Sequence, residues 1–108
     1  MSNNRILVSV VSLTWNSENW IKRFITSLVS DFESDNIPYE IIIIDNGSTD
    51  RTVSIIEEFQ KNNDSIMLIR LGKNMGTTFS RNIGLRMAKG EYIFVLDSDT
   101  EIPIGTTK

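Results

Sequence analysis

Two aspartates, Asp97 and Asp99, are the residues best placed to do chemistry, and only Ser98 separates them. They follow the apolar run at 91–96 (EYIFVL), which predicts a strand. Alternate residues of a strand point the same way, so the two carboxylates share a face. They repel each other unless a cation lies between them, and their hard oxygen atoms suit Mg²⁺ or Mn²⁺. The pattern therefore predicts a metal site that also binds a diphosphate, and the alternative is a solvated acidic turn.

Polar residues also follow two other apolar runs. Asp45 and Asn46 come directly after the run at 39–44 (YEIIII). Side chains at such a strand end can hydrogen-bond a nucleotide base or ribose, or they can serve only the loop that starts the next helix. Trp15 lies between Thr14 and Asn16 in the loop after the first apolar run. Its ring either stacks on a nucleobase or closes the hydrophobic core.

Arg81 is the one basic residue that we place near these groups. It lies in the first turns of the helix predicted at 77–89, where it either reaches a diphosphate or is a solvated surface residue. The sequence has no histidine and no cysteine, which excludes disulfides, Cys-based zinc sites and the common His-assisted nucleophiles. Acid–base chemistry therefore falls to carboxylates. The net charge of −3 argues against a broad surface for nucleic acid or an anionic membrane.

The elements that must position these residues alternate between apolar runs and amphipathic segments. We predict strands at 5–11, 39–44, 65–71 and 91–96, with a helix in each interval, so the order is βαβαβαβ. Connections of this length imply parallel strands and right-handed crossovers. We therefore expect one domain, residues 1–108, built on an open, mainly parallel, Rossmann-like α/β sheet. We place Trp20, Phe79 and Met87 on the buried faces of their helices.

The absence of known nucleotide-binding motifs argues against other classes of nucleotide-binding protein. No Gly-x-Gly-x-x-Gly follows the first strand, and no Gly-x-x-x-x-Gly-Lys-Ser/Thr phosphate loop is present. A pyrophosphorylase-type nucleotidyltransferase would show a Gly-rich, basic loop after that strand, but residues 12–19 contain no Gly, Lys or Arg. The polar N-terminus lacks a secretory apolar core, and no apolar run approaches the ~20 residues of a membrane span. We expect a cytoplasmic protein.

Taken together, three stretches resemble the family 2 glycosyltransferases, which share the GT-A fold. They are 8–16 (VSVVSLTWN), 40–52 (EIIIIDNGSTDRT) and 74–100 (NMGTTFSRNIGLRMAKGEYIFVLDSDT). They cover nearly the whole chain in the order and spacing of the family. The combination is specific, although no single stretch is.

The resemblance implies a nucleotide-diphospho-sugar donor, a divalent metal and inverting transfer to a carbohydrate or lipid-linked acceptor in glycan or polysaccharide synthesis. Asp97 and Asp99 would hold the metal, with Asp99 the more direct ligand. The loop after the first strand would line the base pocket, and Asp45 would contact the base or ribose. The predicted substrate-binding residues are Thr14, Trp15, Asn16, Asp45, Asn46, Arg81, Asp97, Ser98 and Asp99.

Two departures from the family pattern qualify the resemblance. Many members carry Asp-Asp where this chain has Asp45-Asn46. The usual acceptor-binding half and catalytic base lie well beyond the Asp-x-Asp motif, so we expect a domain truncated after that motif and name no catalytic base. A non-catalytic nucleotide-binding module is the alternative. We also expect the strand at 91–96 to form an open sheet edge, which either pairs with a second copy or is covered by the tail.

Overall fold

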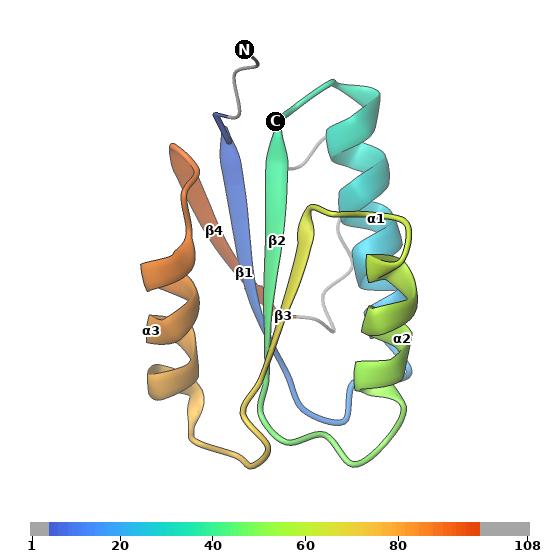
Figure 1. Cartoon of the computed structure of the whole chain (residues 1–108), viewed down its shortest axis with the longest axis vertical. Coiled ribbons are helices and arrows are strands. Elements are labelled where there is room, and N and C mark those ends of the chain that lie inside the picture. The colour runs from blue at the N-terminus through green and yellow to red at the C-terminus, as the bar shows by residue number, and fades with distance from the viewer. Residues whose placement is uncertain (1–4, 98–108) are drawn as a thin grey trace.

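The protein is a four-stranded parallel sheet with helices on both faces, seen in a computed structural model that describes residues 5–97 (Figure 1). Its strands run in the order β3-β2-β1-β4. Their bounds are β1 Val8–Thr14, β2 Tyr39–Asp45, β3 Ile66–Arg70 and β4 Tyr92–Asp97. The predicted α/β fold class and the order of its elements are therefore confirmed.

Three helices connect the strands. They are α1 Ile21–Ser34, α2 Thr52–Gln60 and α3 Thr77–Met87. Figure 1 shows α1 and α2 together on one face of the sheet and α3 on the other. No helix within residues 5–97 is long and apolar enough to cross a membrane.

The strand order reverses beside β1. From β1 the chain moves outward through β2 to β3, and α3 then carries it back across the sheet to β4 on the other side of β1. In open α/β sheets, ligands bind at the carboxyl ends of the strands next to such a reversal. The topology therefore points to the ends of β1 and β4, which are Thr14 and Asp97.

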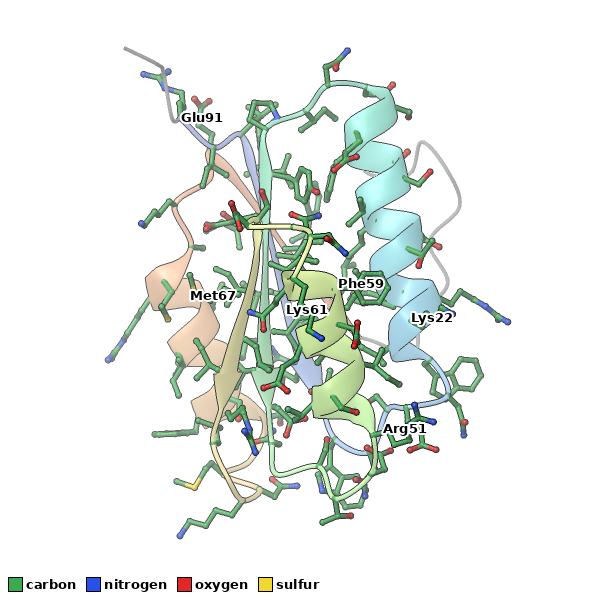
Figure 2. The ribbon with its side chains drawn as sticks, turned by 45° about the vertical axis from the view of Figure 1, so that its right-hand side comes forward. Lys22, Arg51, Phe59, Lys61, Met67 and Glu91 are labelled. Carbon is green, nitrogen blue, oxygen red and sulfur yellow. The ribbon has the colours of Figure 1, made fainter. Side chains whose placement is uncertain are left out.

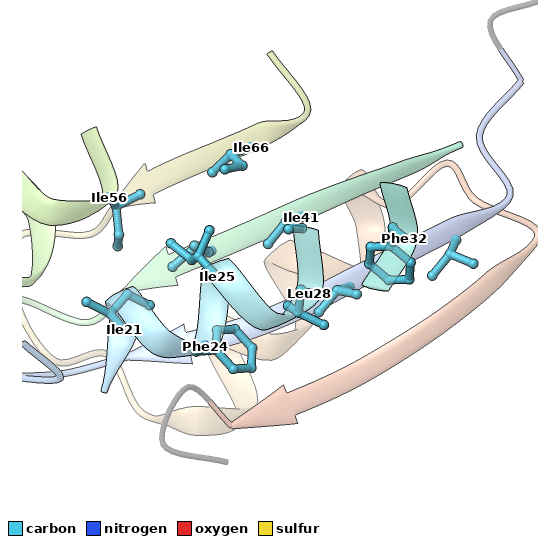
Figure 3. Packing of buried hydrophobic residues seen from close by; sticks show 11 residues of the cluster. Ile21, Phe24, Ile25, Leu28, Phe32, Ile41, Ile56 and Ile66 are labelled. Carbon is cyan, nitrogen blue, oxygen red and sulfur yellow. The ribbon is translucent and has the colours of Figure 1, made fainter. Parts of the chain in front are cut away.

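The larger hydrophobic core lies between the sheet and α1 (Figure 3). Helix α1 contributes an apolar stripe at helical spacing, and its members Ile21, Phe24, Ile25, Leu28 and Phe32 are almost fully buried. The isoleucines of β2 face both ways, with Ile41 and Ile43 toward α1 and Ile42 and Ile44 in the core beneath α3. Burial on both faces explains why this strand is almost continuously apolar.

Helix α3 lies close to the sheet because it contacts it through small residues. Ser80 and Gly84 are its buried positions. A Cβ atom on Gly84 would overlap Val11 and lie 2.8 Å from Cδ1 of Ile44, so only glycine fits there. Gly84 therefore permits the close packing of α3 on the sheet.

Several local predictions are wrong. Trp20 precedes α1 and is 47% exposed, so it does not belong to the core. Phe79 and Met87 are exposed as well, because α3 approaches the sheet along the face that carries Ser80 and Gly84. Strand β1 begins and ends three residues later than predicted, since residues 5–7 precede the ladder and Ser12–Thr14 extend it to the binding edge.

Candidate functional site

Three of the predicted site residues are the last residues of neighbouring strands. Thr14 of β1 pairs with Asp45 of β2, and Leu13 of β1 pairs with Asp97 of β4. The backbones of Thr14, Asp45 and Asp97 therefore lie side by side at one edge of the sheet. Of the Asp-x-Asp motif, the structure describes the Asp97 backbone, whereas Ser98 and Asp99 lie outside the described residues.

Both oxygens of the Asp45 carboxylate accept hydrogen bonds from neighbouring groups of the protein. Its Oδ1 accepts hydrogen bonds from Thr14 Oγ1 at 2.7 Å and Ser48 Oγ at 2.6 Å. Its Oδ2 accepts from the backbone N–H groups of Gly47 at 3.2 Å and Ser48 at 2.9 Å. Asp45 is only 2% exposed. It therefore shapes the loop and holds Thr14, and both of the roles predicted for it remain compatible with its position.

Asn46 joins the β2 loop to α3. Its Oδ1 accepts hydrogen bonds from Met75 N at 3.2 Å and from Ser80 Oγ at 2.7 Å, and its backbone N–H donates to the Thr14 carbonyl at 2.8 Å. Asn46 is buried. Its side-chain oxygen positions the first turn of α3. Arg81, the residue after Ser80, is exposed to solvent.

The loops after β1 and β2 are tied together through Asn16. The backbone N–H of Asn16 donates to Ser48 Oγ at 2.8 Å, and Asn16 Oδ1 accepts from Thr49 N at 2.8 Å. Asn16 has a φ of 49°, in the left-handed region that asparagine tolerates better than most residues. A second tie joins Ser17 N to Thr52 Oγ1 at 2.7 Å. The side-chain oxygen of Asn16 is thus part of the scaffold of the site.

Asp50 reinforces the same junction. It accepts hydrogen bonds from the backbone N–H and hydroxyl of Thr52 and from the backbone N–H of Glu18. Burial acts to raise the pKa of Asp50, but these hydrogen bonds favour the charged carboxylate, and the net pKa lies below its ordinary value. Helix α2 begins at Thr52, and Asp50 accepts the hydrogen bond of its first backbone N–H.

Trp15 is the exposed member of the first loop. It is 56% exposed, whereas Thr14 before it is buried and Asn16 after it is tied to the β2 loop. Its backbone N–H donates to Ser17 Oγ at 3.3 Å. The ring therefore projects from a tied loop beside the strand ends, so the alternative in which Trp15 closes the core is wrong.

The donor chemistry of the strand ends fits a divalent cation. Asp97 is the last residue of β4, and Asp99 follows it by two residues in the sequence. Carboxylate oxygens are the ligands that Mg²⁺ and Mn²⁺ prefer. Among residues 5–97 there is no group of three or more His, Cys, Asp or Glu side chains that could hold a metal.

The family described as Glycosyl transferase family 2 matches residues 9–107. The chain belongs to the family 2 glycosyltransferases. This match favours the glycosyltransferase interpretation over the nucleotidyltransferase alternative.

Two bacterial relatives illustrate the match. TuaG of Bacillus subtilis strain 168, a glycosyltransferase named for teichuronic acid biosynthesis, is 33% identical over 92% of this chain and 38% of its own length. The poly(ribitol-phosphate) beta-N-acetylglucosaminyltransferase TarS of Staphylococcus aureus is 34% identical over 93% of this chain and 17% of its own. The chain thus spans less than two fifths of the length of these relatives.

Solved structures show the same GT-A fold. A crystal structure of S. aureus TarS has a TM-score of 0.82 and 32% identity, covering 94% of this chain and 30% of that one. The mannosyltransferase PcManGT from Pyrobaculum calidifontis, solved with GDP-Man and Mn²⁺, has a TM-score of 0.80 and 25% identity, covering 92% and 29%. The family resemblance and the fold expected from it are confirmed.

Sequence reasoning missed the hydrogen bonds that hold the loops together. Ser48, Asp50 and Thr52 fix the junction between the β1 and β2 loops, and Glu40 and Ser9 form a buried pair elsewhere in the sheet. The available signal was a polar side chain inside an apolar strand. Glu40 stands directly before four isoleucines, where a charged residue needs a buried partner.

Proposed function

We propose that this chain is the donor-binding domain of a glycosyltransferase. It binds a nucleotide-diphospho-sugar at the carboxyl ends of β1 and β4 through a divalent metal, Mg²⁺ or Mn²⁺, held by Asp97 and Asp99. The observation that carries the proposal is the reversal of strand order beside β1, which brings Asp97 next to the loop that carries Trp15.

Structural neighbours support the class of ligand. TarS has been crystallised with UDP and with UDP-GlcNAc, and PcManGT with GDP-Man and Mn²⁺. These structures cover 87–92% of this chain. A nucleoside diphosphate is therefore the common element of the proposed donor.

Each side chain has a proposed role. Trp15 stacks on the nucleobase, because its ring is exposed on a tied loop. Asp45 holds Thr14 and the β2 loop in place beside the base and ribose. Arg81 extends from the start of α3 toward the diphosphate. A bound metal would neutralise the charge that develops on the departing nucleoside diphosphate.

We further propose that transfer inverts the sugar and serves polysaccharide synthesis, with a carbohydrate or lipid-linked acceptor. The names of TuaG and TarS support the polymer. This chain offers no histidine as the base for the acceptor hydroxyl. Glu101, the nearest further carboxylate, lies outside the described residues and does not match the position of the family's base.

Calorimetry with UDP, dTDP and GDP tests the donor proposal. With Mn²⁺ present, at least one nucleotide should bind, and EDTA should abolish that binding. Asp99→Ala should weaken it about tenfold or more, equivalent to about 1.4 kcal/mol. Asp64→Ala is the matched control, since this exposed aspartate precedes β3 at the opposite end of the sheet.

The outcomes separate the candidate functions. Unchanged affinity in Asp99→Ala would contradict the metal assignment. Metal-dependent binding of a nucleotide without turnover of its sugar conjugate is the result expected of a donor domain alone. If a longer polypeptide that contains this chain binds the nucleotide sugar but transfers no sugar, the chain is a non-catalytic binding module.

A further inference from the structure

Glu40 is a buried carboxylate with no part in the proposed site. It lies near the start of β2, at the end of the sheet away from Thr14, Asp45 and Asp97, and is 6% exposed. Its Oε2 accepts a hydrogen bond from Ser9 Oγ at 2.6 Å and another from the backbone N–H of Lys89 at 2.7 Å. Ser9 and Glu40 are paired residues of neighbouring strands.

Ser9 extends this contact to the next residue of the α3–β4 connection. Its Oγ accepts the backbone N–H of Gly90 at 2.8 Å while donating its own proton to Glu40. A Cβ atom on Gly90 would lie 2.7 Å from both Ser9 N and Ser9 Oγ, so this approach requires glycine. We call Ser9, Glu40, Lys89 and Gly90 the β4 clamp.

Apart from its backbone ladder with β1, few side-chain contacts set the position of strand β4: Leu96 packs against the larger core, and Glu91, just before the strand, pairs with Arg5 at 3.4 Å. Within residues 5–97 β4 pairs with β1 only, and α3 packs on β1 and β2. Four of its apolar side chains, Tyr92, Ile93, Phe94 and Val95, are 37–60% exposed. Side-chain packing therefore does little to choose one register over another. A slip of one residue would turn the described side chains of β4 to the opposite face and move the Asp97 backbone out of register with Leu13.

We propose that Glu40 and Ser9 are positioning residues that set the register of β4 and thereby place Asp97 for metal-dependent nucleotide binding. They anchor Lys89 and Gly90 just before the strand begins. Gly90 precedes Asp97 by seven residues, roughly 23 Å at about 3.3 Å per residue. Figure 2 shows this separation: Glu91, which follows the clamp, lies at one end of the molecule, and Arg51, which follows the β2 loop, lies near the other.

This proposal has two parts, and only the second rests on the proposed function. The first part is that the clamp holds β4 on β1. The second is that this placement matters for the metal and the diphosphate. Amide hydrogen exchange without any nucleotide tests the first part, and nucleotide affinity tests the second.

Glu40→Ala, Glu40→Gln and Gly90→Ala are the informative variants. Glu40→Ala removes the acceptor for Ser9 and Lys89, whereas the amide oxygen of glutamine can still accept both bonds. Gly90→Ala keeps both clamp side chains but forces the connection away from Ser9. Glu57→Ala is the matched control, an exposed carboxylate on α2.

Hydrogen exchange in β4 should rise about tenfold or more in Glu40→Ala and Gly90→Ala relative to exchange in β2, and it should stay near wild type in Glu40→Gln and Glu57→Ala. The Mn²⁺-dependent gain in affinity for UDP or GDP should fall about tenfold in the first two variants, the scale typical of lost support around a metal ligand.

Three outcomes overturn the proposal. Unchanged β4 exchange in Glu40→Ala shows that the clamp does not hold the strand. An equal rise in all strands, with Glu40→Gln no better than Glu40→Ala, shows a general stabilising role. Faster β4 exchange with an unchanged Mn²⁺-dependent affinity shows that register does not control the site. If wild type binds no nucleotide, the donor proposal fails while the exchange data still decide the clamp.

Discussion

The hydroxyl of Thr14 donates a hydrogen bond of 2.7 Å to Oδ1 of Asp45, joining the carboxyl ends of β1 and β2. Both residues are buried. The same carboxylate also accepts from Ser48 Oγ and from two backbone N–H groups. One side chain thus fixes the end of β1 and the first turn of the β2 loop, so the shape of this part of the site depends on its charge and its acceptors.

Asp45→Ala should lower both stability and nucleotide affinity. The buried Thr14 hydroxyl and the N–H groups of Gly47 and Ser48 lose their acceptor, which should reduce the free energy of unfolding by about 1–3 kcal/mol. The domain should stay folded and bind UDP or GDP about tenfold more weakly, about 1.4 kcal/mol. Urea denaturation and calorimetry measure the two effects. Normal affinity of the folded variant would assign Asp45 a purely structural role.

Trp15→Ala should weaken nucleotide binding without a loss of stability, because its ring is exposed and contributes little to the core. Loss of a base-stacking ring costs about 1–3 kcal/mol of binding free energy. Trp20 provides the matched control, as the second tryptophan and likewise exposed. Nucleotide should quench the fluorescence of Trp20→Phe but not that of Trp15→Phe. Quenching that disappears with Trp20 instead would refute the stacking role.

Asp50→Asn should change the acid sensitivity of the fold. Since the folded pKa of Asp50 lies below its ordinary value, its charged form adds stability above the unfolded pKa, about 3.9. That stability is lost as pH falls through the lower folded pKa. Asp50→Asn should therefore be less stable than wild type near pH 7, and the difference should shrink below about pH 4. Urea denaturation across this range measures it, with Asp64→Asn as control, and a difference that is constant with pH would contradict the assignment.

The strands and their order could be predicted because each is a distinct apolar run bounded by polar loops. The run at 39–44 is buried on both faces, and its almost continuous series of apolar residues indicates this burial. The position of Asp45 at the carboxyl edge followed from the same pattern. Its hydrogen bond to Thr14 could not, because the two residues are 31 positions apart and no local pattern records their contact.

The exposed aromatic side chains show where periodicity fails. Trp20 continues the apolar stripe of α1 in sequence, but the helix begins one residue later, so Trp20 lies outside the packed face. In α3 the contact with the sheet is made by Ser80 and Gly84. Large apolar residues such as Phe79 then lie beside the contact rather than in it. Helical spacing identifies a stripe of apolar residues. The face that packs on the sheet can instead be a stripe of small residues, because these let the helix approach the sheet closely.

The β4 edge leads to the last prediction, that the purified 108-residue chain self-associates. Within residues 5–97, β4 has a partner strand on one side only, and its side chains from Tyr92 to Val95 are exposed on both faces. An apolar edge strand with free backbone groups pairs readily with another copy.

A charged residue at the centre of that edge should prevent the association. Phe94→Lys replaces an exposed apolar side chain of β4, and lysine is a residue that natural edge strands use against pairing. Leu85→Lys is the control, since Leu85 is also exposed but lies on α3. Light scattering at micromolar concentration should give a dimer for wild type and Leu85→Lys and a monomer for Phe94→Lys. A monodisperse wild-type species of 12.3 kDa would refute the dimer, and a dimer that survives Phe94→Lys would place the interface away from β4.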